Sequence, residues 1–237
     1  MSEYRLLLHR HGKTWPTPGI RRTLEVMERE LPGFFPVRLP VAPGRFLPIA
    51  CAADFRETDI PKEFISDFFL LVPFEGARGE ELEILDHHPS SGTSVVTLKW
   101  SSVDELPPTA VLKRLLGAFG TALEVDWGMV SDSHTFMRND IHERRFMIDK
   151  TSVPTALFWM NWLGPKQLRA MGPDRLARLE SLAVVEPQPP RGVLVTLQEE
   201  RFSTANPLHV RRREEAEAAL GLEELHRQHP QRVGEKR

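Results

Sequence analysis

The residues best suited to chemistry lie near the N-terminus, where Arg10, His11, Gly12 and Thr14 follow the apolar run Leu6–Leu8. A histidine at the end of a buried strand can act as a nucleophile that takes up a phosphoryl group. An adjacent arginine would stabilise the charge that spreads over the phosphoryl oxygens, and a glycine would let the backbone approach them. The segment therefore raises the hypothesis of a phosphoryl-transfer site.

This string of residues resembles the signature of histidine phosphatases and phosphoglycerate mutases. The resemblance implies that His11 is the nucleophile and that Arg10 binds phosphate oxygens. The same family needs a second histidine after a late apolar strand, and neither 156–163 nor 192–197 contains one. His134 is the distant candidate. Phosphoryl transfer is therefore kept as the alternative function, beside the interpretation of this segment as an ordinary strand-to-loop turn.

Other combinations of possible ligands give weaker signals. Histidines and carboxylates are neighbours in four places: His9 with His11, His87 with His88, Asp132 with His134, and His142 with Glu143. None places two histidines one helical turn apart beside a glutamate, which is the metalloprotease pattern. Cys51 is the single cysteine, and the 15 glycines are too dispersed for a nucleotide-binding loop. We therefore expect no metal and no cofactor.

Hydrophobic periodicity indicates the elements that would position these residues. Continuous or alternating apolar runs predict strands, and apolar residues at intervals of three and four predict helices. The predicted strands are 4–9, 94–100, 125–130, 156–163 and 192–197, and the predicted helices are 21–31, 109–123, 166–182 and 207–225. Four prolines make 34–49 either an edge pair of strands or an extended loop. Pro73 is expected to stop an apolar strand that begins at Phe68.

The irregular order of strands and helices favours an α+β fold, in which helices pack on a mostly antiparallel sheet. A doubly wound α/β sheet is the second choice. The length of 237 residues is ordinary for one domain of this kind. We expect a single α+β domain over residues 1–226 and a polar C-terminal tail over 227–237.

Composition and charge restrict the location and the partners. Thirty-one Lys and Arg residues against 33 Asp and Glu residues leave a net charge of −2, which gives no overall attraction to nucleic acid or anionic lipid. The longest apolar runs are shorter than the roughly 20 residues that cross a bilayer. One cysteine and an N-terminus unlike a signal peptide fit a reducing cytosol. We expect a cytoplasmic protein without direct contact to nucleic acid or membrane.

Several segments of the C-terminal half share one order and spacing with a known family. They are Val125–Gly128, Trp159–Leu163, the helix after Gly164-Pro165, Gly192–Leu197 and Asn206–Val210. Together they resemble the immunity protein 52 family, and Met27–Gly33 resembles a related uncharacterised myxobacterial family. The resemblance implies an immunity protein that binds and neutralises a toxin delivered by neighbouring bacterial cells, often a nuclease. Such a protein is not an enzyme.

Two groups of residues could then contact the toxin. Nuclease clefts are built to hold phosphate and so favour acidic inhibitors. The densest acidic stretch contains Glu80, Glu81, Glu83 and Asp86, which we expect to bind the partner, and the alternative is a polar surface loop. The aromatic set Phe158, Trp159 and Trp162 belongs either to the core or to a partner surface.

Overall fold

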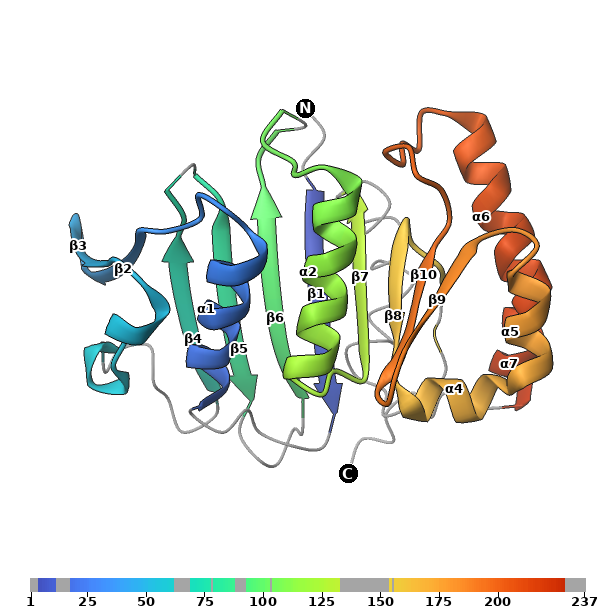
Figure 1. Ribbon diagram of the computed structural model, residues 1–237, viewed down its shortest axis with the longest axis horizontal. Helices are drawn as coiled ribbons and strands as arrows, with labels where there is room; N and C mark the ends of the chain where they lie inside the picture. Colours follow the sequence, from blue (N-terminus) through green and yellow to red (C-terminus); the bar gives the residue numbers. More distant parts are fainter. Residues whose placement is uncertain are drawn as a thin grey trace, which may run out of the picture.

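The computed structural model describes residues 4–11, 18–61, 69–77, 79–87, 93–102, 104–132, 154 and 156–228. These residues form one ten-stranded sheet with the strand order β3-β2-β4-β5-β6-β1-β7-β8-β10-β9 (Figure 1). Every described pair of neighbouring strands is antiparallel. The expected α+β fold is therefore confirmed, and the doubly wound alternative is wrong because it requires parallel pairs.

The elements have the following bounds. The strands are β1 (Tyr4–His11), β2 (Val37–Ala42), β3 (Arg45–Ile49), β4 (Phe69–Glu75), β5 (Glu81–His87), β6 (Thr93–Trp100), β7 (Trp127–Asp132), β8 (Met160–Leu163), β9 (Val184–Gln188) and β10 (Gly192–Thr196). The described helices are α1 (Pro18–Glu30), α2 (Thr109–Ala122), α4 (Pro165–Met171), α5 (Pro173–Leu179), α6 (Pro207–Leu220) and α7 (Leu222–Gln228). None of these helices is long and apolar enough to cross a bilayer.

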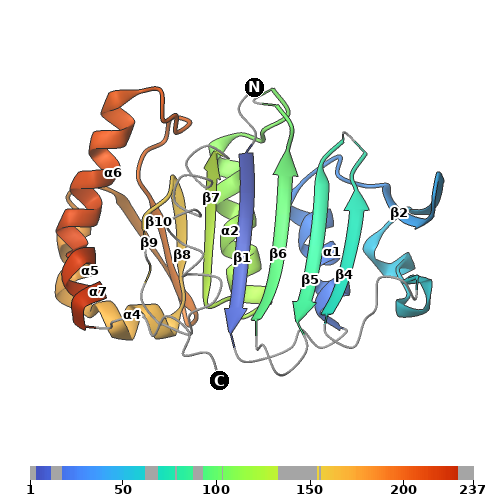
Figure 2. The ribbon, with the colours of Figure 1, turned by 180° about the vertical axis from the view of Figure 1, so that it is seen from behind.

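β1 lies in the middle of the sheet, between β6 and β7. Its side chains alternate between the two faces, as in any strand. Leu6 and Leu8 are fully buried in an apolar core that α1 and α2 close. Leu7 belongs to a second core on the opposite face, with residues of α4 to α7. Figure 1 shows α1 and α2 in front of the strands, and Figure 2 shows them behind.

Several predicted boundaries were wrong. The acidic stretch forms strand β5, and strand β9 was not predicted. The expected helix over 166–182 is two helices that meet at Gly172-Pro173. The expected helix over 207–225 is also two, because Gly221 adopts a left-handed conformation that ends α6. α7 continues to Gln228, past the expected start of the tail, and residues 229–237 lie outside the described part.

Pro73 does not stop β4, contrary to expectation. The strand continues to Glu75, and Pro73 pairs in register with Glu83 of β5. On its other side β4 meets β2 at only one register position, between Arg38 and Glu75. The ladder between β4 and β2 is therefore incomplete, and it does not need the N–H that proline lacks. A strand tolerates proline where the ladder on one side is incomplete.

Both outer strands of the sheet are short and contain proline. β3 carries Pro48 and β9 carries Pro187. The prediction for 34–49 had left an edge pair and an extended loop open, and the edge pair β2–β3 is confirmed.

Candidate partner-binding site

The segment that suggested phosphoryl transfer does not present its arginine to a ligand. Arg10 Nη2 lies 3.3 Å from Glu124 Oε2, and the other carboxylate oxygen of Glu124 lies 3.0 Å from Arg191 Nη1. Arg10 is therefore already bound by a carboxylate. Gly12, Thr14, His134 and the side chain of His11 lie outside the described residues.

The described residues contain no group of three or more His, Cys, Asp or Glu side chains that could hold a metal ion. His9 is fully buried, and its ring packs on the indole of Trp127 with 5.3 Å between ring centroids. Asp132 is also buried, and Cys51 is a partly exposed free thiol. The other histidines and carboxylates considered as ligands, namely His88, His134, His142 and Glu143, lie outside the described part of the chain.

The structure separates the four acidic residues that were expected to bind the partner. Glu80 is buried, and its carboxylate folds back over the turn between β4 and β5, against Gly76. Glu81 and Glu83 are two residues apart on β5, so both side chains lie on the sheet face opposite α1. The backbone of Asp86 pairs with β4 and β6, and its side chain is outside the described part.

Basic residues lie between the carboxylates on this face. Lys99 Nζ lies 2.9 Å from Glu83 Oε1 and 3.6 Å from Glu81 Oε2. One strand further on, Glu75 forms an ion pair with Arg38. Figure 2 shows β4, β5 and β6 with no helix in front of them. Glu81 is exposed and Glu83 is half-exposed, and the two share one cation, Lys99. Their role in partner binding stays a prediction.

The aromatic set belongs to the core. Phe158, Trp159 and Trp162 are at most 1% exposed, so they are not a partner surface. Each indole N–H reaches a backbone carbonyl: Trp159 Nε1 donates to Gln198 O at 2.9 Å, and Trp162 Nε1 donates to Val125 O at 3.0 Å. Trp159, just before β8, is thus tied to the loop after β10, and Trp162 of β8 is tied to the turn before β7.

A groove lies where the loop between β10 and α6 meets the first turns of α6. Its volume is about 680 Å³. The lining residues are Gln198, Glu199, Glu200, Asn206, Leu208, His209, Arg211, Arg212 and Glu215. This groove was not predicted from the sequence, because Leu208 and Val210 at the helix start give no signal of which of them is exposed.

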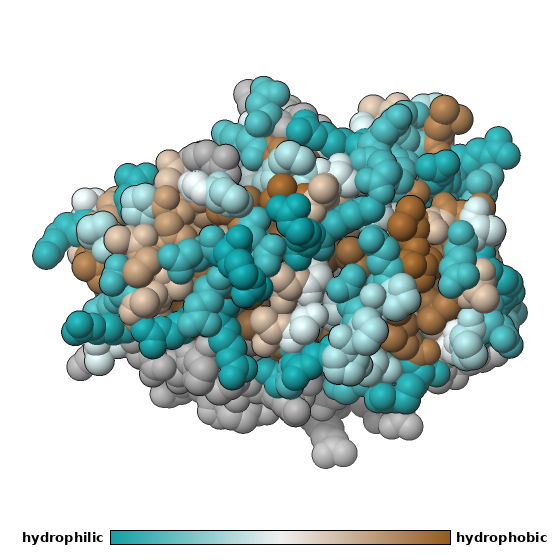
Figure 3. Space-filling view, viewed as in Figure 1, coloured by the Kyte–Doolittle hydropathy of each residue, from teal (hydrophilic) through white to brown (hydrophobic). Residues whose placement is uncertain are grey.

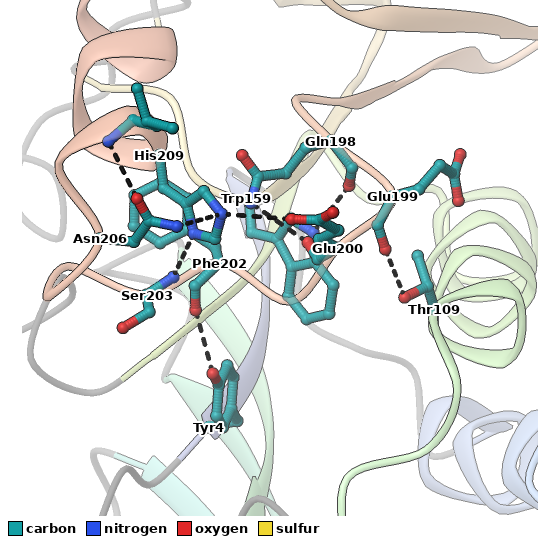
Figure 4. A network of polar contacts seen from close by, with 11 residues as sticks. Tyr4, Thr109, Trp159, Gln198, Glu199, Glu200, Phe202, Ser203, Asn206 and His209 are labelled. Atoms are coloured by element: carbon teal, nitrogen blue, oxygen red, sulfur yellow. Dashed lines mark hydrogen bonds and ion pairs between the residues drawn. The ribbon is translucent and has the colours of Figure 1, made fainter.

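Hydrogen bonds from distant elements hold the loop that forms the groove (Figure 4). Tyr4 Oη donates to Phe202 O at 3.0 Å, and Thr109 Oγ1 donates to Glu199 O at 2.9 Å. Trp159, the residue before β8, donates to Gln198 O. The loop is therefore anchored on β1, on α2 and on the residue that precedes β8.

The first turn of α6 is fixed in the same way. Asn206 is the N-cap, and its Oδ1 accepts a hydrogen bond from Leu208 N at 3.0 Å. Pro207 occupies the first helical position, where its missing N–H costs nothing. His209 Nδ1 accepts a hydrogen bond from Ser203 N at 3.1 Å, which joins the helix back to the loop.

Leu208 projects from this rigid frame into solvent. It is 72% exposed, more than the other exposed large apolar residues of the described part, Phe46 and Val184. Figure 3 shows an apolar area over β9 and β10 and, apart from it, apolar surface near the start of α6 that polar residues surround. An apolar centre with a polar rim is the usual arrangement of a protein-binding surface.

The charged residues of the groove are unequally paired. Lys113 binds Glu199, and Arg211 Nε lies 2.8 Å from Glu215 Oε1. Glu200 is 86% exposed, and its nearest basic group is His209 Nε2 at 3.6 Å. Within the described part of the chain, no Lys or Arg lies within ion-pair distance of Glu200. No described carboxylate lies within that distance of Arg212.

The hydroxyl of Tyr4 gives a test of whether the loop is anchored in solution. Tyr4 is the only tyrosine, so tyrosinate absorbance reports on this group alone. Burial raises the pKa of the Tyr4 hydroxyl, Asp132 raises it further, and Arg201 opposes the shift. We expect the native protein to titrate at a higher pH than the urea-unfolded chain, whose tyrosine follows the ordinary value of about 10.

The same shift predicts how Tyr4 affects stability. A raised folded-state pKa means that the neutral hydroxyl is favoured in the fold, so stability is retained below pH 10 and lost as the pH rises through the folded pKa. Tyr4→Phe should remove this loss and cost roughly 1 kcal/mol at neutral pH for the missing hydrogen bond. A native titration that coincides with the unfolded one would show that the Tyr4 hydroxyl is not buried as described.

Comparisons with known proteins agree with this architecture. The immunity protein 52 family matches residues 88–227, a segment that holds the groove but not the acidic residues of β5. No curated protein has a matching sequence. The solved structure of the Pseudomonas aeruginosa T6SS protein PA0821 is similar with a TM-score of 0.65 at 13% sequence identity. The similarity covers 94% of this chain and 76% of that chain, and it shows a shared fold.

Proposed function

This chain belongs to the immunity protein 52 family, and from that we propose that it binds a cognate bacterial toxin and neutralises it without catalysis of its own. The family match over 88–227 is the observation that carries the proposal. A continuous sheet with a hydrogen-bonded loop supports it, because tight inhibitors bind with little rearrangement.

The alternative function is phosphoryl transfer by the Arg10-His11-Gly12 segment. The ion pair between Arg10 and Glu124 counts against it, because a phosphate would have to displace a bound carboxylate. We expect His11→Ala to protect cells as well as the wild-type protein does. Loss of protection in a folded His11→Ala variant, together with phosphate release by the wild type alone, would favour the enzyme.

The toxin in this proposal is a nuclease, and the immunity protein meets it in the cytoplasm. Glu81 and Glu83 are the exposed carboxylates of β5 and could face cations of a cleft that holds phosphate. Glu80 is left out of this proposed acidic surface because its side chain is buried. Asp86 is also left out, because the alternation along β5 groups position 86 with Leu82 and Ile84 and not with Glu81 and Glu83.

Co-expression with the product of the adjacent gene tests the proposal. The expected result is rescue of growth, a stable complex in size-exclusion chromatography, and intact cellular nucleic acid in rescued cells. Toxicity without nucleic acid damage, but with rescue, would retain the immunity function and reject a nuclease. Failure of both rescue and complex formation with the adjacent toxin would reject the immunity function for that pair.

Charge reversal tests the acidic surface separately. The double variant Glu81→Lys with Glu83→Lys should weaken binding of a nuclease toxin, because two attractive charges become repulsive. The matched control is Glu25→Lys with Asp54→Lys, which changes the net charge equally at exposed carboxylates elsewhere. Equal affinities of the two double variants, measured by calorimetry, would remove the β5 carboxylates from the interface.

A further inference from the structure

We propose that the toxin docks in the groove at the start of α6, with Leu208 as the apolar anchor and Glu200 facing a basic side chain of the toxin. The inference rests on the proposed immunity function and names the surface that performs it. It commits to a protein partner that presents an apolar residue next to a lysine or arginine.

The exposed leucine is the first step of the argument. Isolated apolar residues on a surface are common, but Leu208 stands beside a groove and is held by an N-capped helix turn. His209, the next residue, is turned inward and bonded to the loop. The helix start therefore orients the two neighbours oppositely and directs the leucine to solvent.

Preorganisation is the second step. A loop that becomes ordered only on binding loses affinity through the entropy of ordering. Here the carbonyls of Gln198, Glu199 and Phe202 each accept a hydrogen bond from another element before binding. The entropy of ordering this loop is thus lost when the protein folds and not when the toxin binds. This arrangement suits tight inhibition.

Charge complementarity is the third step. Glu199 and Glu215 are already bound by Lys113 and Arg211, so they attract a partner weakly. Glu200 lies largely in water with a histidine as its nearest basic group. A toxin lysine or arginine placed opposite Glu200 would complete the ion pair, and a carboxylate opposite Arg212 would fix the orientation of the bound segment.

The position of the groove is consistent with a large partner. It lies inside the segment that the family shares, 88–227. Figures 1 and 2 place the start of α6 at the same end of the sheet as the start of β5, where Glu81 lies. A toxin that covers this end of the sheet could contact both surfaces, with the groove as the site of its anchor.

Substitutions in the groove test the docking surface in the full-length protein. Leu208→Glu should weaken binding of the purified toxin by about 100-fold or more, as expected for an anchor residue. Glu200→Lys should weaken it by about tenfold, mostly through a slower association that depends on salt. Val184→Glu is the matched control, because it changes another exposed apolar residue of the same family segment and should leave affinity within about threefold.

The outcomes separate the two proposals. If the wild-type protein neither binds nor protects against the adjacent toxin, the immunity function fails for that pair. If the wild type binds but Leu208→Glu and Leu208→Ala both bind within threefold of it, the docking surface is wrong and the function stands. The tyrosinate titration of Tyr4 in each variant shows whether the loop has kept its anchor, so a loss of affinity with a native titration is a loss of contact.

Discussion

Trp162→Ala is expected to lower the free energy of unfolding by about 3–5 kcal/mol. The indole is fully buried between α2 and β10, at two positions where glycine leaves room for it. A Cβ at Gly120 or at Gly192 would overlap the indole ring. Truncation would leave a cavity that helix and strand cannot close, and Val125 O would lose its hydrogen-bond donor.

Urea denaturation followed by circular dichroism measures this loss. Trp162→Phe is the matched control, because it keeps an aromatic ring in the cavity and should cost less than the alanine variant. Gly120→Ala should also be destabilising, since overpacking a full core costs about 1–3 kcal/mol. A cost below about 1 kcal/mol for Trp162→Ala would show that the indole does not join the two elements as described.

Asn161→Leu is the second large effect, with an expected loss of roughly 2–5 kcal/mol. The buried amide of Asn161 satisfies both backbone groups of Phe158: Oδ1 accepts from Phe158 N at 2.9 Å, and Nδ2 donates to Phe158 O at 2.8 Å. Leucine has the same number of side-chain heavy atoms, branched at Cγ, but its methyl groups are larger and add a packing cost. It leaves a buried donor and a buried acceptor without partners.

Asn161→Asp separates the two bonds, because a carboxylate still accepts from Phe158 N but cannot donate to Phe158 O. It should remain strongly destabilising, since the charge is also buried. At Asn206 the same substitution should change stability by less than about 0.5 kcal/mol, because aspartate is as good an N-cap as asparagine. If Asn161→Leu had the same urea midpoint of unfolding as the wild-type protein, the predicted role of the amide would be wrong.

These two residues explain why the C-terminal pattern was recognisable from sequence. Trp159, Asn161 and Trp162 each make a specific buried contact that few other side chains could replace. A short motif of this kind is therefore a good indicator of the fold. It carries no information about the partner, whose contacts are made by exposed side chains that obey no periodicity.

The strand β5 shows what periodicity could have predicted and did not. Leu82 and Ile84 are buried and alternate with the exposed or half-exposed Glu81 and Glu83, which is the pattern of a strand with one solvated face. The same stretch is also dense in carboxylates, which is equally typical of a polar surface loop. The burial of Glu80 was not predictable, because it depends on how the turn after β4 folds back on Gly76.

The groove could not be predicted for a related reason. Its loop has no regular structure of its own and is shaped by Tyr4, Thr109 and Trp159, which are far from it in the chain. The local sequence pattern around each of these residues indicates only a strand or a helix start. The long-range hydrogen bonds that they make depend on tertiary structure.

The prolines of the two edge strands affect how this protein can recognise others. Recognition by strand addition uses main-chain hydrogen bonds, which are nearly the same for any sequence. Pro48 and Pro187 remove a donor from β3 and β9, and such prolines normally lie with this side toward solvent, which discourages a further strand. Recognition of a partner must then depend on side chains. Under the proposed function, point substitutions on the surface would change which toxin the protein binds while the buried framework stays the same.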